Sequence, residues 1–283
     1  MTTVPHRATL ARSVRLLRAF RLEQTDPGYF YGLLASDTVA QLSSYADLEG
    51  ATVIDVGSGA GFFTNALRAA GARCVGIECD AGEMTAAGAP PPGSIRGSGL
   101  ELPLRSGSAD VCFSSNVLEH VPEPWRMADE MVRATRPGGV IYLSYTNWLS
   151  PWGGHETSPW HYLGGHRAAR RYERRYGKRP KNRFEDGLYA VSVSAALDWA
   201  RAHADAEILD ALPRYHPRWA RAVIRVPGLR EVATWNLVLV LRRRSRSGAA
   251  AQPRPEAIGV DSPPAGAATG TGGDDHDPAD LTA

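Results

Sequence analysis

The chain opens with a segment in which apolar residues recur at helical spacing and arginines stand between them. The apolar positions are Leu10, Val14, Leu17 and Phe20. A pattern of this kind is typical of an amphipathic helix. The stretch DPGYFYGLLA, residues 26–35, breaks the pattern and predicts the start of a second helix. We therefore predict that residues 1–47 form an N-terminal helical cap.

From residue 51 onward, short apolar runs alternate with helical patterns. The predicted strands are 51–56, 73–78, 94–97, 109–115, 139–145, 206–212 and 234–242. The predicted helices are 61–70, a short one near residue 81, 125–136 and 191–203. Alternation of this kind predicts an α/β fold, in which helices cover both faces of a parallel sheet.

Two regions depart from the alternation. Residues 148–190 are rich in Trp, His, Tyr, Gly and Arg, and a loop this long is usually functional or disordered. Its aromatic content argues against disorder, so we predict a substrate lid inside a domain of residues 48–245. Residues 246–283 are rich in Ala, Gly, Pro, Ser, Thr and Asp without apolar periodicity, which predicts a disordered tail.

Composition limits the binding partners and the cellular location that we expect for the protein. Its net charge of +2 over 283 residues does not by itself indicate nucleic-acid binding. The three cysteines, Cys74, Cys79 and Cys112, lack the paired spacing of a zinc site and predict a reduced, cytoplasmic protein. No run reaches the roughly 18 to 20 apolar residues of a membrane-spanning helix. The first residues also lack the apolar core of a secretory signal.

A glycine-rich turn follows the first predicted strand, in VIDVGSGAGFF at residues 53–63. Gly57, Gly59 and Gly61 are spaced G-x-G-x-G, whereas the dinucleotide fingerprint is G-x-G-x-x-G, and the Lys-Ser/Thr of a P-loop is missing. Asp55 stands at the end of the strand. A buried carboxylate there would oppose a pyrophosphate but would suit a ligand that carries a cationic amine.

A second carboxylate ends the next strand. Glu78 follows the turn by roughly 20 residues, the place from which an acid accepts hydrogen bonds from ribose hydroxyls. The predicted ligand therefore has a ribose, a positive group and no phosphate. S-adenosylmethionine has all three properties.

Four stretches within about residues 50–148 resemble one known family. VIDVGSGAGFF, VGIECD, GLELPLRSGSADVCFSSNVLEHV and RPGGVIYLS are similar to the class I S-adenosylmethionine-dependent methyltransferases of the type 11, ubiquinone-methylase-like group. The resemblance implies a Rossmann-like fold with a seven-stranded, mostly parallel sheet and with S-adenosylmethionine as the cofactor.

The resemblance also implies a set of cofactor contacts. The methionine moiety would be lined by Asp55, Gly57, Ser58, Gly59 and Gly61, while Glu78 holds the ribose and Cys79 lies against the adenine. Asn116, Val117 and Leu118 would flank the sulfonium, and Tyr29 and Tyr31 would cap the pocket. The family commonly has an aspartate at Ser98, so backbone groups of Gly99 and Leu100 are expected to make the adenine contact instead.

Candidates for catalysis follow the fourth and fifth predicted strands. An oxygen acceptor must lose a proton during methyl transfer, and a histidine can accept it near neutral pH. The resemblance implies that His120 faces the substrate, and the lid adds His155, Glu156 and His161 as further candidate bases. Each could equally be a packing or surface residue. We predict no metal, because the spacing of these lid residues and His166 is irregular and methyl transfer needs none.

We therefore predict O-methylation of a small molecule, a sugar or a lipid-linked glycan. The alternatives are C-methylation of a quinone-type lipid and a non-catalytic, methyltransferase-like scaffold; an NAD-dependent oxidoreductase is disfavoured by Asp55 and Phe62. The basic stretches 166–183 and 214–230 are either solvated faces or surfaces for an anionic acceptor or acidic lipid headgroups. We expect no nucleic-acid partner, and a location in the cytoplasm or at the inner face of the membrane.

Overall fold

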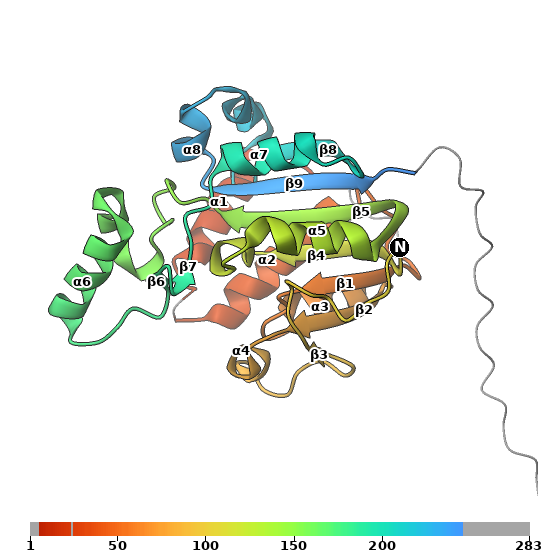
Figure 1. Cartoon of the computed structure of the whole chain (residues 1–283), viewed down its shortest axis with the longest axis horizontal. Helices are drawn as coiled ribbons and strands as arrows, with labels where there is room; N and C mark the ends of the chain where they lie inside the picture. The colour runs from red at the N-terminus through yellow and green to blue at the C-terminus, as the bar shows by residue number, and fades with distance from the viewer. Residues whose placement is uncertain (1–5, 24, 246–283) are drawn as a thin grey trace, which may run out of the picture. The chain divides into compact units, whose positions relative to one another are not determined.

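A computed structural model describes residues 6–23 and 25–245 (Figure 1). Seven strands form one sheet in the order β3-β2-β1-β4-β5-β9-β8. The strands are β1 (Thr52–Val56), β2 (Arg73–Glu78), β3 (Ile95–Arg96), β4 (Ala109–Ser115), β5 (Thr135–Thr146), β8 (Ala206–Pro213) and β9 (Asn236–Arg243). Strands β1 to β5 pair in parallel, whereas β9 is antiparallel to both of its neighbours. The predicted sheet is confirmed, and the predicted tail, 246–283, lies outside the described residues.

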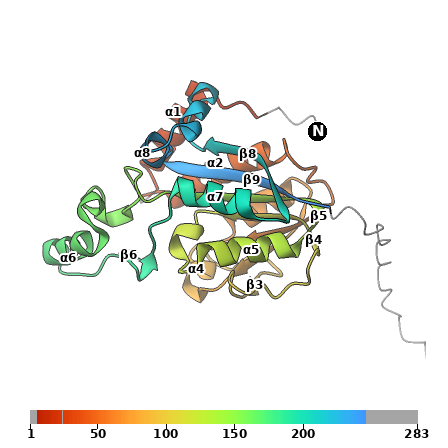
Figure 2. The same cartoon turned by 45° about the horizontal axis from the view of Figure 1, so that its top comes forward.

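Helices cover both faces of this sheet (Figures 1 and 2). The α-helices are α1 (Leu10–Phe20), α2 (Pro27–Leu42), α3 (Phe62–Ala69), α4 (Ala81–Thr85), α5 (Pro124–Ala134), α6 (Gly165–Tyr176), α7 (Val193–Ala202) and α8 (Leu229–Ala233). Short 3-10 helices are η1 (Leu118–His120), η2 (His155–Thr157), η3 (Trp160–Leu163) and η4 (Arg218–Arg225). Among the described helices, none is both long enough and apolar enough to cross a membrane.

Alternate residues along the strands build a core on each face. Ile141 of β5 belongs to the core that buries Met131 of α5 and Leu197 of α7. Its neighbour Tyr142 faces the other way, into the core that holds Leu34 of α2. Successive side chains of a strand point to opposite faces, so a strand buried on both faces appears in the sequence as a continuous apolar run.

Helix α1 buries a different stripe from the one that its apolar residues suggest. Arg12 and Leu16 are buried, whereas Leu10, Val14 and Leu17 are 61%, 39% and 36% exposed. The reason is an ion pair: the Arg12 guanidinium binds the Asp37 carboxylate of α2 through two hydrogen bonds of 2.8 and 2.5 Å. The spacing predicted the helix but not the orientation of its faces.

The predicted lid leaves the sheet between β5 and α7 and returns to its starting point. The backbone N–H of Trp148 donates to the carbonyl of Val191 at 2.9 Å, which closes the base of the insertion. Inside it, Trp148 packs on His161 and Phe184, with ring centroids 5.2 and 4.8 Å apart. The lid also holds α6, a helix of 12 residues, and a small sheet of β6 (Arg183–Phe184) and β7 (Gly187–Leu188). Figure 1 shows it beyond the carboxyl ends of the parallel strands.

Candidate active site

The glycine turn lies at the carboxyl end of β1 and leaves room beside one residue. Gly57 has φ +75°, and a Cβ there would lie 2.4 Å from Cγ2 of Val117, so the turn packs tightly against the residues that follow β4. Gly59 also has a positive φ of +47°, but a Cβ at this position would meet nothing within 4 Å. Such an open, left-handed glycine lets a ligand approach the backbone closely. The turn therefore fits the predicted cofactor cradle.

Asp55 is buried beneath this turn. Only 1% of the residue is exposed, and Oδ2 accepts a hydrogen bond of 2.7 Å from the Thr64 hydroxyl of α3. Burial raises the pKa of Asp55 to about 7, while the Thr64 hydrogen bond acts in the opposite direction and the Glu78 charge adds to the rise. A ligand ammonium group nearby would favour the charged carboxylate. Binding of a cation would therefore lower the free-energy cost of ionising the buried Asp55 carboxyl group.

Glu78 joins the turn to the end of β2. Its Oε2 accepts a hydrogen bond of 2.9 Å from the Gly59 N–H, and its Oε1 accepts from the N–H groups of Cys79 at 2.8 Å and Asp80 at 3.0 Å. The Cys79 thiol also donates to Oε1 at 3.5 Å, whereas Oε2 accepts the Gly59 bond and keeps a second lone pair for a hydroxyl group. The carboxylate is held where the sequence predicts a ribose contact.

The residues after β3 and β4 complete this edge. Ser98 is exposed, and its hydroxyl accepts from the Leu100 N–H at 3.1 Å, next to the predicted adenine contact Gly99. Asn116 has a positive φ of 57°, and its Oδ1 accepts a hydrogen bond of 2.8 Å from Asn236 of β9. Leu118 is only 1% exposed and belongs to the core, so only its backbone can border a ligand.

The predicted capping residues differ in position. Tyr31 stacks on Phe62 with ring centroids 5.5 Å apart, and its hydroxyl donates to Glu23 at 2.8 Å. Because Phe62 directly follows Gly61, this stack lies beside the glycine turn. Tyr29 is 51% exposed on the first turn of α2. The thiol residue predicted to lie against the adenine, Cys79, is also exposed.

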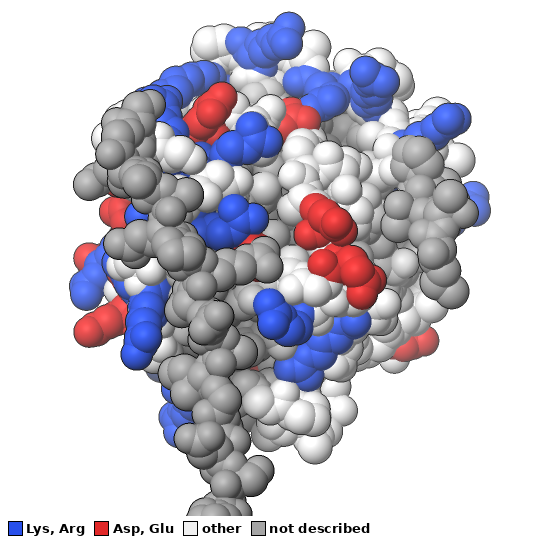
Figure 3. All heavy atoms as spheres, turned by 90° about the vertical axis from the view of Figure 1, so that its right-hand side faces the viewer, with Lys and Arg blue, Asp and Glu red and all other residues white. Residues whose placement is uncertain are grey.

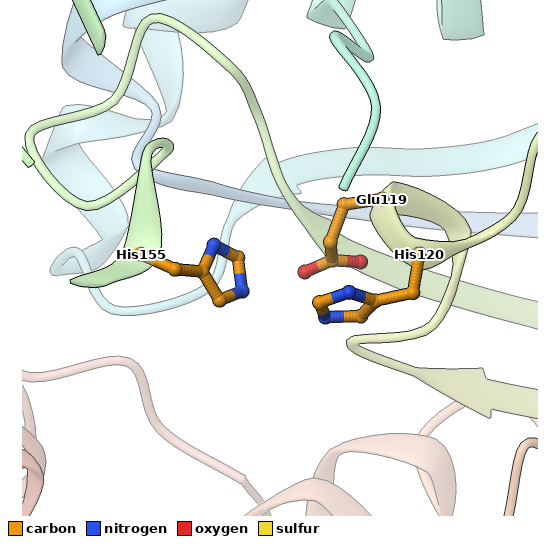
Figure 4. Close-up of side chains that lie close together, drawn as sticks. All are labelled: Glu119, His120 and His155. Atoms are coloured by element: carbon orange, nitrogen blue, oxygen red, sulfur yellow. The ribbon is translucent and has the colours of Figure 1, made fainter. Parts of the chain in front are cut away.

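Three polar side chains converge between η1 and the lid: Glu119, His120 and His155 (Figure 4). One ligand atom from each lies within 4.8 Å of the other two. The imidazole rings of His120 and His155 meet edge to face, with centroids 4.9 Å apart. Glu119 is 1% exposed; its Oε1 accepts from the Thr146 N–H at 2.8 Å, and its Oε2 has no hydrogen-bond partner among the residues that the structure describes. A buried, half-satisfied carboxylate next to two imidazoles favours positive charge between them.

The hydrogen bond of His120 determines where its proton lies. Nδ1 is 2.7 Å from the carbonyl oxygen of Gly187 in the lid. A carbonyl oxygen only accepts, so Nδ1 must carry the hydrogen, and in the neutral ring Nε2 keeps a free electron pair. His155 differs, because burial and the neighbouring His120 lower its pKa. In the neutral ring, Nε2 of His120 is thus free to accept a hydrogen bond from a ligand.

Two predicted candidate bases lie apart from this cluster. His161 is 1% exposed, and its Nε2 bonds the Ser150 carbonyl at 3.1 Å within the aromatic interior of the lid. Glu156 is exposed and accepts a hydrogen bond of 2.9 Å from Asn182. Their positions match the packing and surface alternatives. The three converging side chains could also hold a divalent metal ion, since two imidazoles and a carboxylate form a known donor set.

Two residues of the site were not identified from the sequence. Glu119 stands within the NVLEHV stretch, and only its position beside the two histidines distinguishes it. Arg214 follows β8 by one residue, yet its guanidinium reaches Ser115 at 2.9 Å and Ser144 at 3.0 Å near the ends of β4 and β5. The partners are 99 and 70 residues away from Arg214 in the sequence, so no local pattern predicts these contacts.

The sheet order, the open glycine turn and the two carboxylates define a class I S-adenosylmethionine-dependent methyltransferase. Residues 54–143 match the family described as a methyltransferase domain. An uncharacterized methyltransferase of Mycolicibacterium gilvum is 55% identical over 247 residues, which cover 83% of this chain and 96% of that protein. One from Mycobacteroides abscessus is 51% identical over 251 residues, with coverage of 84% and 96%. The chain belongs to this methyltransferase family.

Solved structures agree with this fold. An S-adenosylmethionine-dependent methyltransferase from Mesorhizobium loti superposes with a TM-score of 0.51 at 20% identity and covers 74% of this chain and 98% of its own. A complex of the Haloferax volcanii Trm112 methyltransferase activator with a putative methyltransferase gives 0.51 at 17% identity, with coverage of 83% and 97%. At these identities the similarity shows the fold alone.

Proposed function

We propose that this methyltransferase methylates an oxygen atom of a small molecule, a sugar or a lipid-linked glycan, with His120 as the base. The observation that carries the proposal is the hydrogen bond between Nδ1 of His120 and the Gly187 carbonyl. In the neutral imidazole, this bond leaves Nε2 unprotonated. It also attaches the ring to the lid, which is the segment most suited to enclose an acceptor. A carbon acceptor that is already nucleophilic would have less need of a base prepared in this way.

S-adenosylmethionine, when bound, supplies a methyl group activated by the positive sulfur. Asp55 and Glu78 would hold the amino and ribose groups, and Gly59 would let the backbone approach. Nε2 of His120 would take the hydroxyl proton of an acceptor that receives this methyl group. The Glu119 carboxylate stabilises the imidazolium that forms. Alignment and exclusion of water supply most of the remaining rate enhancement.

The acceptor can be identified with methyl-labelled S-adenosylmethionine. The purified protein is incubated with the labelled cofactor and with separate lipid and polar extracts, and the labelled product is analysed for the atom that carries the methyl group. A methyl ether or ester supports the proposal, and a methyl group on a quinone-type ring carbon contradicts it. Cofactor binding without any labelled product, in extracts that cover both classes, would favour the scaffold alternative.

The role of His120 needs a variant with a matched control. His120→Gln keeps a polar side chain but cannot accept a proton, so turnover should fall by about 10²-fold to 10⁴-fold while cofactor affinity stays the same. His203→Gln makes the same change at the C-terminal end of α7 and should leave turnover unaltered. Equal turnover in the two variants would remove His120 from the mechanism.

A further inference from the structure

A cavity of about 620 Å³ lies between the segment that precedes α1, the end of α2 and the end of β8. Its lining includes five arginines, which are Arg7, Arg12, Arg214, Arg218 and Arg221. It also includes His6 and His216, and no described residue in the lining is an aspartate or glutamate. The glycine turn, Asp55 and Glu78 do not contribute to its lining, and Arg214 is the one lining residue that also borders the candidate active site.

Carboxylates elsewhere in the described chain neutralise only part of this charge. Asp37 pairs with Arg12, and Asp210 pairs with Arg221. Among the described residues, no carboxylate forms an ion pair with the three remaining arginines of the lining, Arg7, Arg214 and Arg218. The cavity thus carries a net positive charge at neutral pH, and its walls concentrate the field of that charge.

Of these three arginines, Arg214 is the one whose charge is buried. It is 1% exposed, and its guanidinium donates only to neutral oxygens, including the Thr38 hydroxyl at 2.6 Å. Within residues 6–23 and 25–245, its buried Nε finds no hydrogen-bond partner, and neither does Nδ1 of His216. A buried charge without a counter-ion is costly, and unsatisfied buried donors add to that cost. An anion in the cavity would offset the cost of the buried charge and would accept hydrogen bonds from the unsatisfied donors.

Exposed apolar side chains lie close in sequence to two lining residues of the cavity, Ala8 and Arg218. The backbone N–H of Arg218 donates to the carbonyl of Ala8 at 2.7 Å, so the start of η4 and the segment before α1 are joined. Trp219, which follows Arg218, is 77% exposed, and Leu10, two residues after Ala8, is 61% exposed. Further exposed apolar residues are Val14 and Leu17 on α1, and Val226, Leu229 and Val232 between the end of η4 and α8.

The charges on one side of the molecule are unevenly distributed. In the space-filling view of the right-hand side of Figure 1, basic side chains gather along the upper edge (Figure 3). Lower on the same face, acidic and basic side chains are mixed. On α1, Arg15 and Arg18 are exposed beside the apolar stripe. Arginines next to exposed apolar side chains are typical of a helix that lies in the interface of an anionic membrane.

We propose that the α1–η4 surface docks on an anionic membrane and that the cavity receives the phosphate group of one lipid. Arg7 and Arg218 contact the phosphate at the mouth, Arg214 supplies the charge at the floor, and Leu10 and Trp219 enter the acyl boundary. The apolar rim favours a lipid over a nucleic acid, whose phosphates would leave those side chains in water. The inference goes beyond the proposed reaction, and its test measures binding alone, so either can fail without the other.

Vesicle co-sedimentation of the full-length protein tests the docking surface. The probes are vesicles of equal parts phosphatidylglycerol and phosphatidylcholine, with pure phosphatidylcholine as the neutral comparison. We expect binding to the anionic vesicles only, weakening as salt increases. Near an anionic membrane each arginine contributes about a factor of five, so Arg7→Ala combined with Arg218→Ala should weaken binding by about 30-fold. Trp219→Ala alone should weaken it several-fold without a change in charge.

The matched control removes the same charge elsewhere. Arg174 and Arg175 are exposed on α6, so Arg174→Ala with Arg175→Ala should alter vesicle binding by less than about threefold. Equal losses in the two double variants would overturn the proposal, because they would indicate attraction by net charge alone. Binding of inorganic phosphate or of duplex DNA that requires Arg7 and Arg218, without vesicle binding, would also overturn it. Unfolding midpoints for every variant ensure that folded proteins are compared.

Discussion

Replacement of Asp55 by asparagine should make the cofactor-free protein more stable and bind S-adenosylmethionine more weakly. The carboxylate is completely buried, and its pKa moves from an ordinary value of 3.8 to about 7. At about 1.4 kcal/mol for each pKa unit, holding the charge costs the folded state about 4 kcal/mol. Asparagine has no charge to bury, and its Oδ1 can still accept the Thr64 hydrogen bond.

The sign of the pH dependence follows from proton linkage. Below about pH 4 the carboxyl group is neutral in both the folded and the unfolded chain, and it costs the folded state nothing. As pH rises from there to about 7, the unfolded chain releases the proton first, so the folded state loses stability. Above about pH 7 the full cost is present. The stability difference between Asp55→Asn and the wild type should therefore grow across this window and then level off.

Urea unfolding of both proteins at a series of pH values measures this difference. The other titrating groups are common to both proteins and cancel in the comparison. Asp198→Asn removes a carboxylate that is 70% exposed and should give a difference near zero at every pH. A stability difference for Asp55→Asn that stays constant with pH would refute the argument that burial raises this pKa.

Further predictions concern the glycine turn and the base. Gly57→Ala should lower the free energy of unfolding by about 3 kcal/mol, because a left-handed alanine is strained and its Cβ overlaps Val117; Gly50→Ala, which has a similar φ and open space, should cost only about 1 kcal/mol. Gly59→Arg should abolish S-adenosylmethionine binding in calorimetry by filling the open side of the turn, and retained affinity would place the cofactor elsewhere. For His120→Gln, the split between lost turnover and unchanged cofactor affinity is decisive, because a purely structural residue would lower both.

The fold could be predicted from the sequence because its main signals are local. The runs at 73–78 and 109–115 match β2 and β4 at both ends. Apolar runs of strand length, a glycine turn and helical periodicity each reflect neighbours along the chain. The apolar run predicts that β5 starts at residue 139, whereas the strand begins at Thr135, because Thr135 already pairs with Ala109 of β4 ahead of a shift in register.

What the sequence did not reveal depends on long-range pairing. The spacing of the apolar residues in α1 predicts an amphipathic helix but not its buried side, because that side depends on the pairing of Arg12 with Asp37 in a different helix. Of the three candidate bases in the lid, His155 joins His120 of η1, and the group that forms there includes Glu119 from outside the lid. The spacing of these residues cannot show which of them face one another, since that depends on how the lid folds back over the sheet.

The most direct test of the cofactor site is an experimental structure of this protein with S-adenosylhomocysteine bound. We expect the amino group within hydrogen-bond reach of Asp55, the ribose hydroxyls on Glu78 and the backbone of Gly59 against the ligand. A ligand bound away from these three residues, or a turn that closes when the ligand is added, would show that this is not the cofactor site.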